Sequence, residues 1–171
     1  MRLRRLVLPL AMTTLVLVPA NVRAASASGS WPWPVVGPVV RAFDPPSTPF
    51  GAGHRGIDIA VPYGTSIAAP APGVVSFAGP VGGQLFVSVD HGGGLVTSYS
   101  WLSIVAVRRG DSVIQGTILG LTGVGHPGST ITHLHFGARQ DGVYIDPMSL
   151  LSAGSVVDLI RLAPIPAAGG T

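Results

Sequence analysis

Short apolar runs separated by glycine and proline occupy the middle of the chain, and no long amphipathic helical pattern precedes Pro147. Several runs alternate apolar and polar residues, which is typical of strands with one buried face. Gly92-Gly93-Gly94 can adopt positive φ and predicts a hairpin between Leu85–Val89 and Leu95–Tyr99. The pattern predicts an all-β fold with strands at Ser66–Ala69, Gly73–Ala78, Leu85–Asp90, Leu95–Trp101, Asp111–Gly120 and His133–Arg139.

Helical signals are confined to the C-terminal region. Asp146 is a suitable N-cap and Pro147 suits the first helical position, so a helical turn is expected over Pro147–Leu151. Ser155–Leu162 is a candidate for a short terminal helix, and the tail Ala163–Thr171 has the composition of a disordered segment. We therefore expect an antiparallel β-sheet domain followed by a short C-terminal helix.

The first residues have the composition of an export signal. Three arginines precede the apolar run Leu6–Ala20, and Val22-Arg23-Ala24 offers small residues at a cleavage position. A membrane anchor is the competing interpretation, but the run is short for a span of about 20 residues and contains two prolines. We expect a signal peptide over residues 1–24, which makes the protein secreted, extracellular or associated with the cell wall, without stable membrane insertion.

Composition divides the rest of the chain into three parts. Residues 25–40 are rich in Ser, Pro and Trp, which predicts an extended arm and not a separate domain. Residues 41–151 contain the β-rich runs and form the expected domain, since a chain of this length can enclose its own core. Residues 152–171 are expected to be a partly disordered extension.

The charge pattern argues against a nucleic-acid partner. Removal of residues 1–24 takes away four of the ten arginines and leaves six against seven aspartates, a net charge of −1. A nucleic-acid footprint needs clustered basic side chains on the folded domain, whereas only Arg108 and Arg109 are adjacent. We expect a monomer that binds no nucleic acid.

Three missing residue types narrow the possible chemistry. The sequence contains no Cys, no Glu and no Lys. These absences exclude thiolate metal sites, the helical HExxH zinc site with its glutamate base, and lysine nucleophiles. A bound metal would need nitrogen and oxygen ligands, and proton transfer would fall to His, Asp or Tyr.

Two histidine motifs carry the candidate chemistry. In His133-Leu134-His135 the histidines flank one residue, so on a strand both project to the same face, about 6.6 Å apart. One can bind metal while its neighbour handles protons. His54 and Asp58 have an H-x3-D spacing, and the β-branched Ile57 and Ile59 place them in a loop that enters a strand.

The ligand types match a hydrolytic zinc site. Such a site takes three protein ligands and keeps a fourth position for water, whose pKa falls to about 7 on binding. His54, Asp58 and His135 agree with that number and type, so one zinc ion is the expected cofactor. Each motif alone is more often a pair of surface or hydrogen-bonded side chains. Their joint presence among only five histidines favours the metal site.

The surrounding sequence adds longer stretches to these motifs. In order and spacing they resemble the M23 family of zinc metallopeptidases, of the LytM or lysostaphin type, over roughly residues 43–151. The stretches are GAGHRGIDIAVPYGTSIAAPAPGVVSFAG, GGQLFVSVDHGGGLVTSYSWLS, VRRGDSVIQGTILGLTG and HLHFGARQDGVYIDPMSLL.

The resemblance implies a secreted zinc metalloendopeptidase that hydrolyses peptide bonds in bacterial peptidoglycan. His54, Asp58 and His135 would hold zinc in a β-sheet groove, where an activated water attacks the peptide bond. His133 would be the non-ligand catalytic histidine, which orients that water, shuttles its proton or stabilises the oxyanion. The family cleaves glycine bridges as well as D-amino-acid linkages, so both remain candidate bonds.

One position departs from the family pattern. A second non-ligand histidine usually lies in a Y-x-H-L segment, which here reads Tyr99-Ser100-Trp101-Leu102. The indole N–H of Trp101 can donate a hydrogen bond but cannot accept a proton. Loss of an acid–base imidazole would lower the rate by about 10²–10⁴. The alternative function is a catalytically impaired relative that binds cell wall or regulates another hydrolase.

His126 offers a replacement imidazole. It lies in the glycine-rich loop Gly123–Gly128, just before the strand that carries His133, and such a loop could fold over the groove. We regard His126 as a candidate catalytic residue, and a solvent-exposed loop histidine is the competing interpretation.

Overall fold

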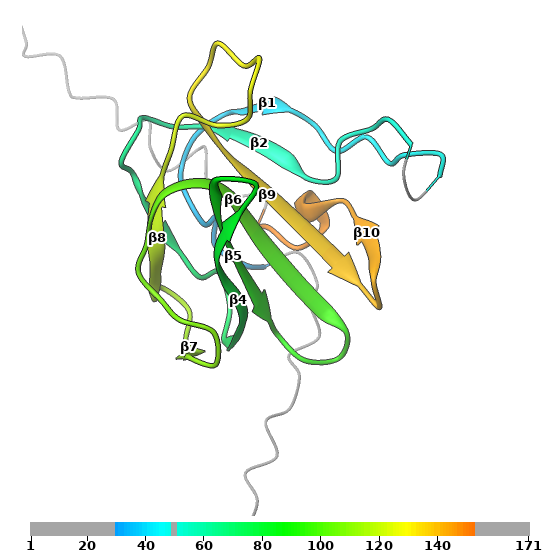
Figure 1. Cartoon of the computed structure of the whole chain (residues 1–171). Helices are drawn as coiled ribbons and strands as arrows, with labels where there is room; N and C mark the ends of the chain where they lie inside the picture. The colour runs from blue at the N-terminus through cyan, green and yellow to red at the C-terminus, as the bar shows by residue number, and fades with distance from the viewer. Residues whose placement is uncertain (1–29, 49–50, 153–171) are drawn as a thin grey trace, which may run out of the picture.

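The computed structural model describes residues 30–48 and 51–152, which form a branched β-sheet followed by one 3-10 turn (Figure 1). All strand pairs within these residues are antiparallel. The elements are β1 (Val39–Arg41), β2 (Ile57–Ala60), β3 (Ser66–Ala68), β4 (Gly73–Val81), β5 (Gln84–Asp90), β6 (Leu95–Val105), β7 (Ser112–Val113), β8 (Ile118–Thr122), β9 (His133–Gln140), β10 (Val143–Ile145) and the 3-10 helix η1 (Pro147–Ser149).

The central strand β6 changes partner partway along its length. One edge of β6 pairs with β5, and the other edge pairs first with β9 and then with β8. Ser100 is the last residue paired with β9, opposite His135, and Leu102 is the first paired with β8, opposite Thr122. Trp101, between them, has a φ of 66°. The strand therefore bends at the point where the sheet divides.

Alternation along β9 separates the core from the opposite face of the sheet. Leu134, Phe136 and Ala138 are buried core residues, and the Phe136 ring lies 5.4 Å from that of Tyr99 on β6. Burial of an aliphatic or aromatic side chain of this size stabilises the fold by about 1.5–3 kcal/mol. Because neighbouring side chains on a strand point to opposite faces, His133 and His135 face away from this core.

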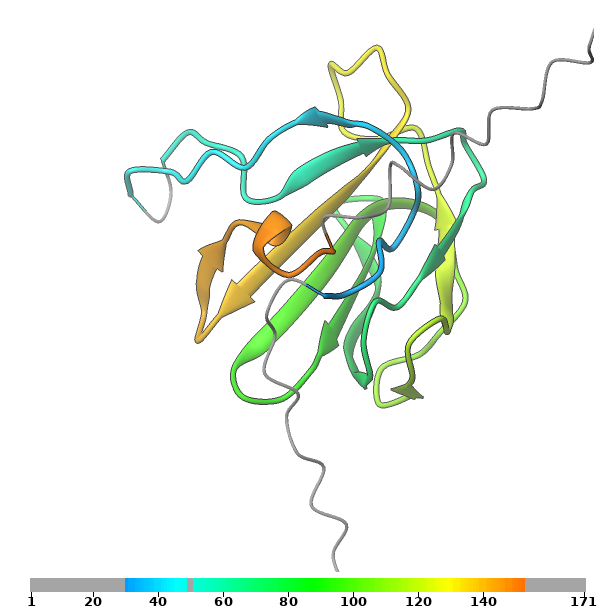
Figure 2. The same cartoon turned by 180° about the vertical axis from the view of Figure 1, so that it is seen from behind.

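The segment before β1 packs on the domain. Trp31 is a buried core residue whose ring lies 4.8 Å from that of His91. Its backbone N–H donates to the Leu150 carbonyl at 3.0 Å, and its carbonyl accepts from the Ser152 N–H at 2.8 Å. Seen from behind, the blue N-terminal segment runs beside the orange C-terminal turn (Figure 2). The described part of the predicted arm thus belongs to the packed structure.

The all-β prediction is confirmed, and so is the hairpin through Gly92-Gly93-Gly94, which joins β5 to β6. The prediction of one strand over Asp111–Gly120 is wrong. The Thr117 N–H donates to the Ile114 carbonyl at 3.0 Å, in a turn where Gly116 has a φ of 87°. This turn separates β7 from β8.

Helical structure in the described residues is limited to η1. Oδ1 of the predicted cap, Asp146, accepts a hydrogen bond from the Met148 N–H at 2.9 Å, and Pro147 begins the turn. The expected short C-terminal helix is therefore a single 3-10 turn within this part of the chain. The candidate helix Ser155–Leu162 and the export signal 1–24 lie outside the described residues. None of the helical structure described is long and apolar enough to cross a membrane.

Candidate metal centre and active site

Antiparallel pairing of β2 with β9 brings the two histidine motifs together. Asp58 lies opposite His135, from which it is 77 residues distant in sequence, and Ala60 lies opposite His133. His54 precedes β2 in a segment held by two backbone hydrogen bonds to Asp44, of 2.7 and 3.0 Å. Three separate segments of the chain thus deliver their side chains to one place.

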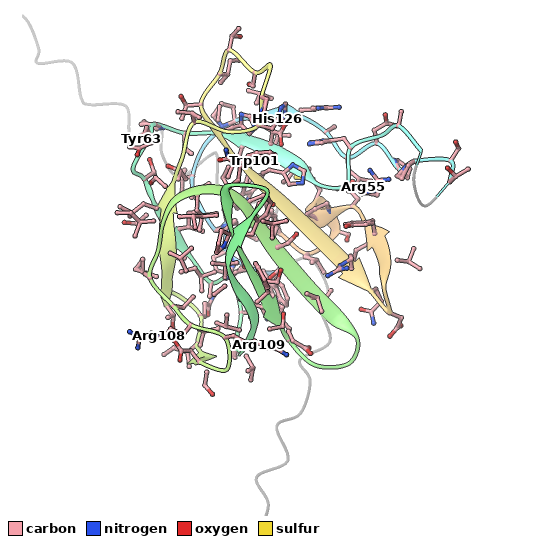
Figure 3. The ribbon with its side chains drawn as sticks, in the orientation of Figure 1. Arg55, Tyr63, Trp101, Arg108, Arg109 and His126 are labelled. Carbon is pink, nitrogen blue, oxygen red and sulfur yellow. The ribbon has the colours of Figure 1, made fainter. Side chains whose placement is uncertain are left out.

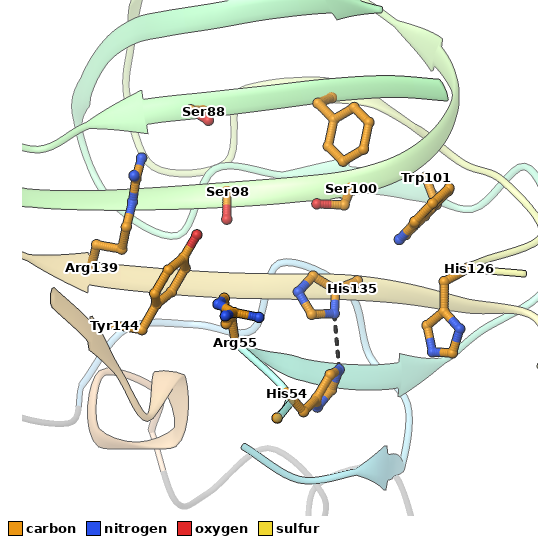
Figure 4. Close-up of a pocket in the computed structure, with 12 residues that line it drawn as sticks. His54, Arg55, Ser88, Ser98, Ser100, Trp101, His126, His135, Arg139 and Tyr144 are labelled. Atoms are coloured by element: carbon orange, nitrogen blue, oxygen red, sulfur yellow. Dashed lines mark hydrogen bonds between the residues drawn. The ribbon is translucent and has the colours of Figure 1, made fainter. Parts of the chain in front are cut away.

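Three side-chain atoms converge between these segments. His54 Nε2 lies 3.0 Å from Asp58 Oδ1 and 3.0 Å from His135 Nδ1, and the latter two atoms are 2.8 Å apart. Figure 4 shows the His54 and His135 rings turned toward each other. His54 and Asp58 are buried, and His135 is partly buried. The structure therefore brings together all three residues predicted as zinc ligands.

Hydrogen bonding alone does not account for this cluster. His54 Nδ1 lies 2.7 Å from the Ala42 carbonyl and therefore carries the hydrogen in the neutral ring, which leaves a lone pair on Nε2. That lone pair faces a carboxylate oxygen and another imidazole nitrogen, so the three atoms share at most one hydrogen, on His135. A cation satisfies all three. Tetrahedral zinc with bonds of about 2.0–2.1 Å places its ligand atoms about 3.3 Å apart, close to the observed spacings.

The protonation of the cluster suits a metal. Burial raises the pKa of Asp58, but the hydrogen bond with His135 and the charges of His135, His54 and His133 outweigh burial and hold this pKa well below its usual range. Burial, together with the charges of His135 and Arg41, lowers the pKa of His54 by more than the Ala42 carbonyl and Asp58 raise it. At neutral pH the cluster therefore offers an ionised carboxylate and a neutral imidazole, the forms that bind metal.

Gly56 allows the close approach of the ligands. A Cβ atom at this position would lie 2.4 Å from the Phe136 carbonyl oxygen and 2.9 Å from His135 Nε2. Contacts this short are not tolerated, so any larger residue would push this segment away from β9. His54 and His135 would then separate.

His133 lies beside the cluster, and both of its ring nitrogens make hydrogen bonds. Its side chain is 1% exposed, and its Nδ1 donates to the Ile131 carbonyl at 2.7 Å. Its Nε2 accepts a hydrogen bond from the His126 backbone N–H at 3.3 Å and lies 3.8 Å from Asp58 Oδ1. This longer spacing leaves His133 outside the compact group of ligand atoms.

His126 also reaches the cluster. Its Nε2 donates to Asp58 Oδ2 at 3.1 Å, and its ring centroid lies 4.6 Å from that of His133. The loop between β8 and β9 therefore folds over this face, as the hypothesis for His126 requires. Asp58, His126 and His133 form a second group whose ligand atoms lie within 4.8 Å of one another. The His54, Asp58 and His135 group is tighter and is the better fit to zinc.

The cluster opens into a groove with an aromatic end. Trp101 lines the groove beside His126, and its ring lies 5.7 Å from that of Phe86 (Figure 4). The figure shows the indole nitrogen on the side of the ring that faces His135 and His126. Trp101 thus presents a hydrogen-bond donor to the groove at the position where the sequence resemblance leads us to expect a histidine.

Sequence reasoning missed the other end of the groove, which is lined by Arg55, Arg139 and Tyr144. Arg139 was detectable, because strand alternation places it on the same face of β9 as His135. Tyr144 has no such local signal. It arrives because β10 folds back on β9 and sets Tyr144 opposite Arg139.

Comparisons with known proteins identify a family. The sequence profile described as Peptidase family M23 matches residues 52–147, a range that includes every predicted ligand and catalytic histidine. The uncharacterized protein Rv2891 of Mycobacterium tuberculosis is 37% identical over 174 residues, which cover 99% of this chain and 67% of that protein. The DD-carboxypeptidase/endopeptidase Mpg of Neisseria meningitidis is 40% identical over 99 residues, 57% of this chain and 22% of that protein.

A solved structure shares the fold as well. The antimicrobial peptidase lysostaphin from Staphylococcus simulans matches with a TM-score of 0.64 at 27% identity, over 82% of this chain and 61% of that chain. The profile match and the extent of the similarity to the mycobacterial protein lead to one conclusion. This chain belongs to peptidase family M23.

Proposed function

We propose that this protein is a secreted zinc metalloendopeptidase that hydrolyses peptide bonds in bacterial peptidoglycan. The observation that carries the proposal is the convergence of three metal-binding atoms, from His54, Asp58 and His135, beside an imidazole that is not part of the group. Membership of a peptidase family supports the reaction class. The resemblance to the LytM and lysostaphin type supports the substrate class, and a signal peptide over residues 1–24 would provide export.

We assign proton transfer to His133. Zinc, when bound, polarises the scissile carbonyl and lowers the pKa of water to about 7. The Ile131 carbonyl holds the hydrogen of His133 on Nδ1, so Nε2 carries the lone pair, which accepts a proton once its 3.3 Å hydrogen bond from the His126 N–H is released. The Asp58 carboxylate, 3.8 Å from Nε2, stabilises the resulting imidazolium. His133 then donates this proton to the leaving amine.

Trp101 and His126 together take the place of the second histidine. The indole N–H of Trp101 lines the groove and donates to the oxygen that becomes negatively charged during attack. An indole exchanges no proton with the substrate. His126 supplies that capacity, because its imidazole lines the same end of the groove and contacts Asp58 at 3.1 Å.

Metal content measured together with hydrolysis tests the proposal. The mature chain, residues 25–171, is expected to hold about one zinc ion per molecule and to solubilise peptidoglycan. His135→Ala should lose both properties, whereas His91→Gln, at a histidine outside the cluster, should keep both. Zinc binding without hydrolysis, unchanged by Trp101→His, would contradict the enzymatic proposal. That result would favour a catalytically impaired protein that binds cell wall or regulates another hydrolase.

A further inference from the structure

Two arginines meet over one aromatic ring at the end of the groove opposite Trp101. The guanidinium carbons of Arg55 and Arg139 lie 5.8 and 5.6 Å from the centroid of the Tyr144 ring. Figure 4 shows this group on the far side of His135 from Trp101 and His126. Stacking on an aromatic face orients a guanidinium and leaves the N–H groups along its edge available.

The local contacts position these cations without neutralising Arg139. Arg55 donates to the Gly51 carbonyl at 3.1 Å, which fixes its side chain in the groove wall. For Arg139, no carboxylate among the described residues lies within the 4.0 Å of an ion pair. Arg139 is also only partly exposed, so its charge is screened less than that of an exposed arginine. A planar anion with two oxygens matches this geometry, because a guanidinium binds carboxylates in a bidentate manner.

The path from the metal cluster to this group is open. His135 and Arg139 lie four residues apart on one face of β9, so their Cα atoms are about 13 Å apart. Gly137 lies between them and has no side chain to block the floor. Ser98 on β6 pairs with Gly137, and its hydroxyl lines the groove at this point. An extended peptide that advances about 3.3 Å per residue spans this path with about four residues.

We propose that Arg139, with Arg55 and Tyr144, forms a subsite for a carboxylate of the substrate peptide. This inference rests on the proposed function and specifies its substrate class. The substrate is a peptide that carries a carboxylate about four residues from the cleaved bond. The carboxylate is supplied either by the C-terminus of the peptide or by an acidic side chain within it.

Matched peptides and arginine variants of the mature chain test the subsite. Three synthetic peptides of one sequence would carry a C-terminal carboxylate, a C-terminal carboxamide, or a carboxamide with one acidic side chain. With the carboxylate peptides, Arg139→Gln should raise KM about tenfold and leave kcat nearly unchanged. With the neutral peptide, the same change should have little effect. The acidic peptide that the wild-type protein prefers identifies the source of the carboxylate.

Two further variants separate this role from a general effect of charge. Arg108→Gln removes an arginine that Figure 3 places far from Arg55, Trp101 and His126, and it should leave the preference intact. Arg139→Lys keeps the charge but loses the planar fork, so it should recover only part of the affinity. Equal KM values for the three peptides in the wild-type protein would overturn the subsite.

Binding measurements distinguish failure of the subsite from failure of the proposed function. Calorimetric titration of the same peptides into His135→Ala reports affinity without hydrolysis. If no peptide is hydrolysed by the wild-type protein but Arg139→Gln still weakens binding of the acidic peptides, the subsite stands and the peptidase proposal falls. If the protein hydrolyses the peptides but shows no preference for a carboxylate in KM or in affinity, the peptidase proposal stands and the subsite falls.

Discussion

Trp101 occupies a backbone conformation that bulky residues rarely adopt. Its φ of 66° lies in the left-handed region, and such strain costs on the order of 1–3 kcal/mol. The strain falls where β6 leaves β9 for β8, and the bend turns the indole onto the groove wall near Phe86. The backbone therefore directs the side chain of residue 101 onto the groove wall, whichever residue occupies this position.

His126 should be required for hydrolysis because, among the described residues, it is the only imidazole lining the groove that is outside the predicted ligand set. His126→Ala should lower the rate of peptidoglycan hydrolysis by about 10²–10⁴ and leave the zinc content unchanged. Adding Trp101→His to this variant should restore much of the rate. Hydrolysis by His126→Ala at the wild-type rate would remove His126 from the mechanism.

At the scale of elements, the loop between β8 and β9 fixes the position of His133. Gly125 in this loop has a φ of 93°, and a Cβ atom there would lie 2.2 Å from Cε1 of the His133 ring. The backbone of His126, the next residue, donates to the same ring. The loop thus packs on His133 and also supplies His126.

Gly125→Ala should therefore displace the His133 ring and impair hydrolysis while the zinc content is retained. Gly128→Ala is the matched control, since Gly128 lies in the same loop at a φ of 85° with nothing within 4 Å of the added Cβ. Both changes cost about 1–2 kcal/mol of backbone strain, but only the first contacts the site. Zinc analysis and steady-state kinetics of the two variants test this prediction. Equal losses of hydrolysis in Gly125→Ala and Gly128→Ala would contradict it.

Strand alternation predicted the shared face of His133 and His135, because this pattern depends only on neighbouring residues. It could not predict that Asp58 pairs opposite His135, since register across 77 residues is set by the burial of whole strands. The position of Tyr144 opposite Arg139 also depends on the pairing of two strands, β10 and β9. The prediction of one strand over Asp111–Gly120 was wrong for a local reason. The chain turns at Gly116, and the pattern of apolar residues gives no sign of this turn.

At the scale of the whole molecule, His91 connects segments that are distant in sequence. Its Nδ1 donates to the Pro72 carbonyl at 2.7 Å, its Nε2 lies 2.8 Å from Thr97 Oγ1, and its ring contacts Trp31. Burial lowers the pKa of His91 by more than the Pro72 carbonyl and the charge of Asp90 raise it. The neutral ring is therefore the form that joins Pro72, just before β4, to β6 and the N-terminal segment.

The lowered pKa of His91 should make the fold sensitive to acid. Below about pH 6.5 the unfolded chain binds this proton more readily than the folded protein, so stability should fall between pH 7 and pH 5. One histidine contributes at most about 1.4 kcal/mol per pH unit. His91→Gln should reduce the slope of unfolding free energy against pH, measured with urea and a chelator. Part of the slope should remain, because the pKa of His54 is also lowered in the folded protein. A slope in His91→Gln identical to that of the wild-type protein would contradict this role of His91.

The bridge between Trp31 and Leu151 runs in parallel, unlike every strand pair of the sheet. The chain therefore approaches Trp31 from one end of this seam and continues beyond Ser152 at the other. Tension applied between the two ends would act along the seam and load both backbone hydrogen bonds of Trp31 at the same time. A molecule stretched in this way would resist by shear along this seam.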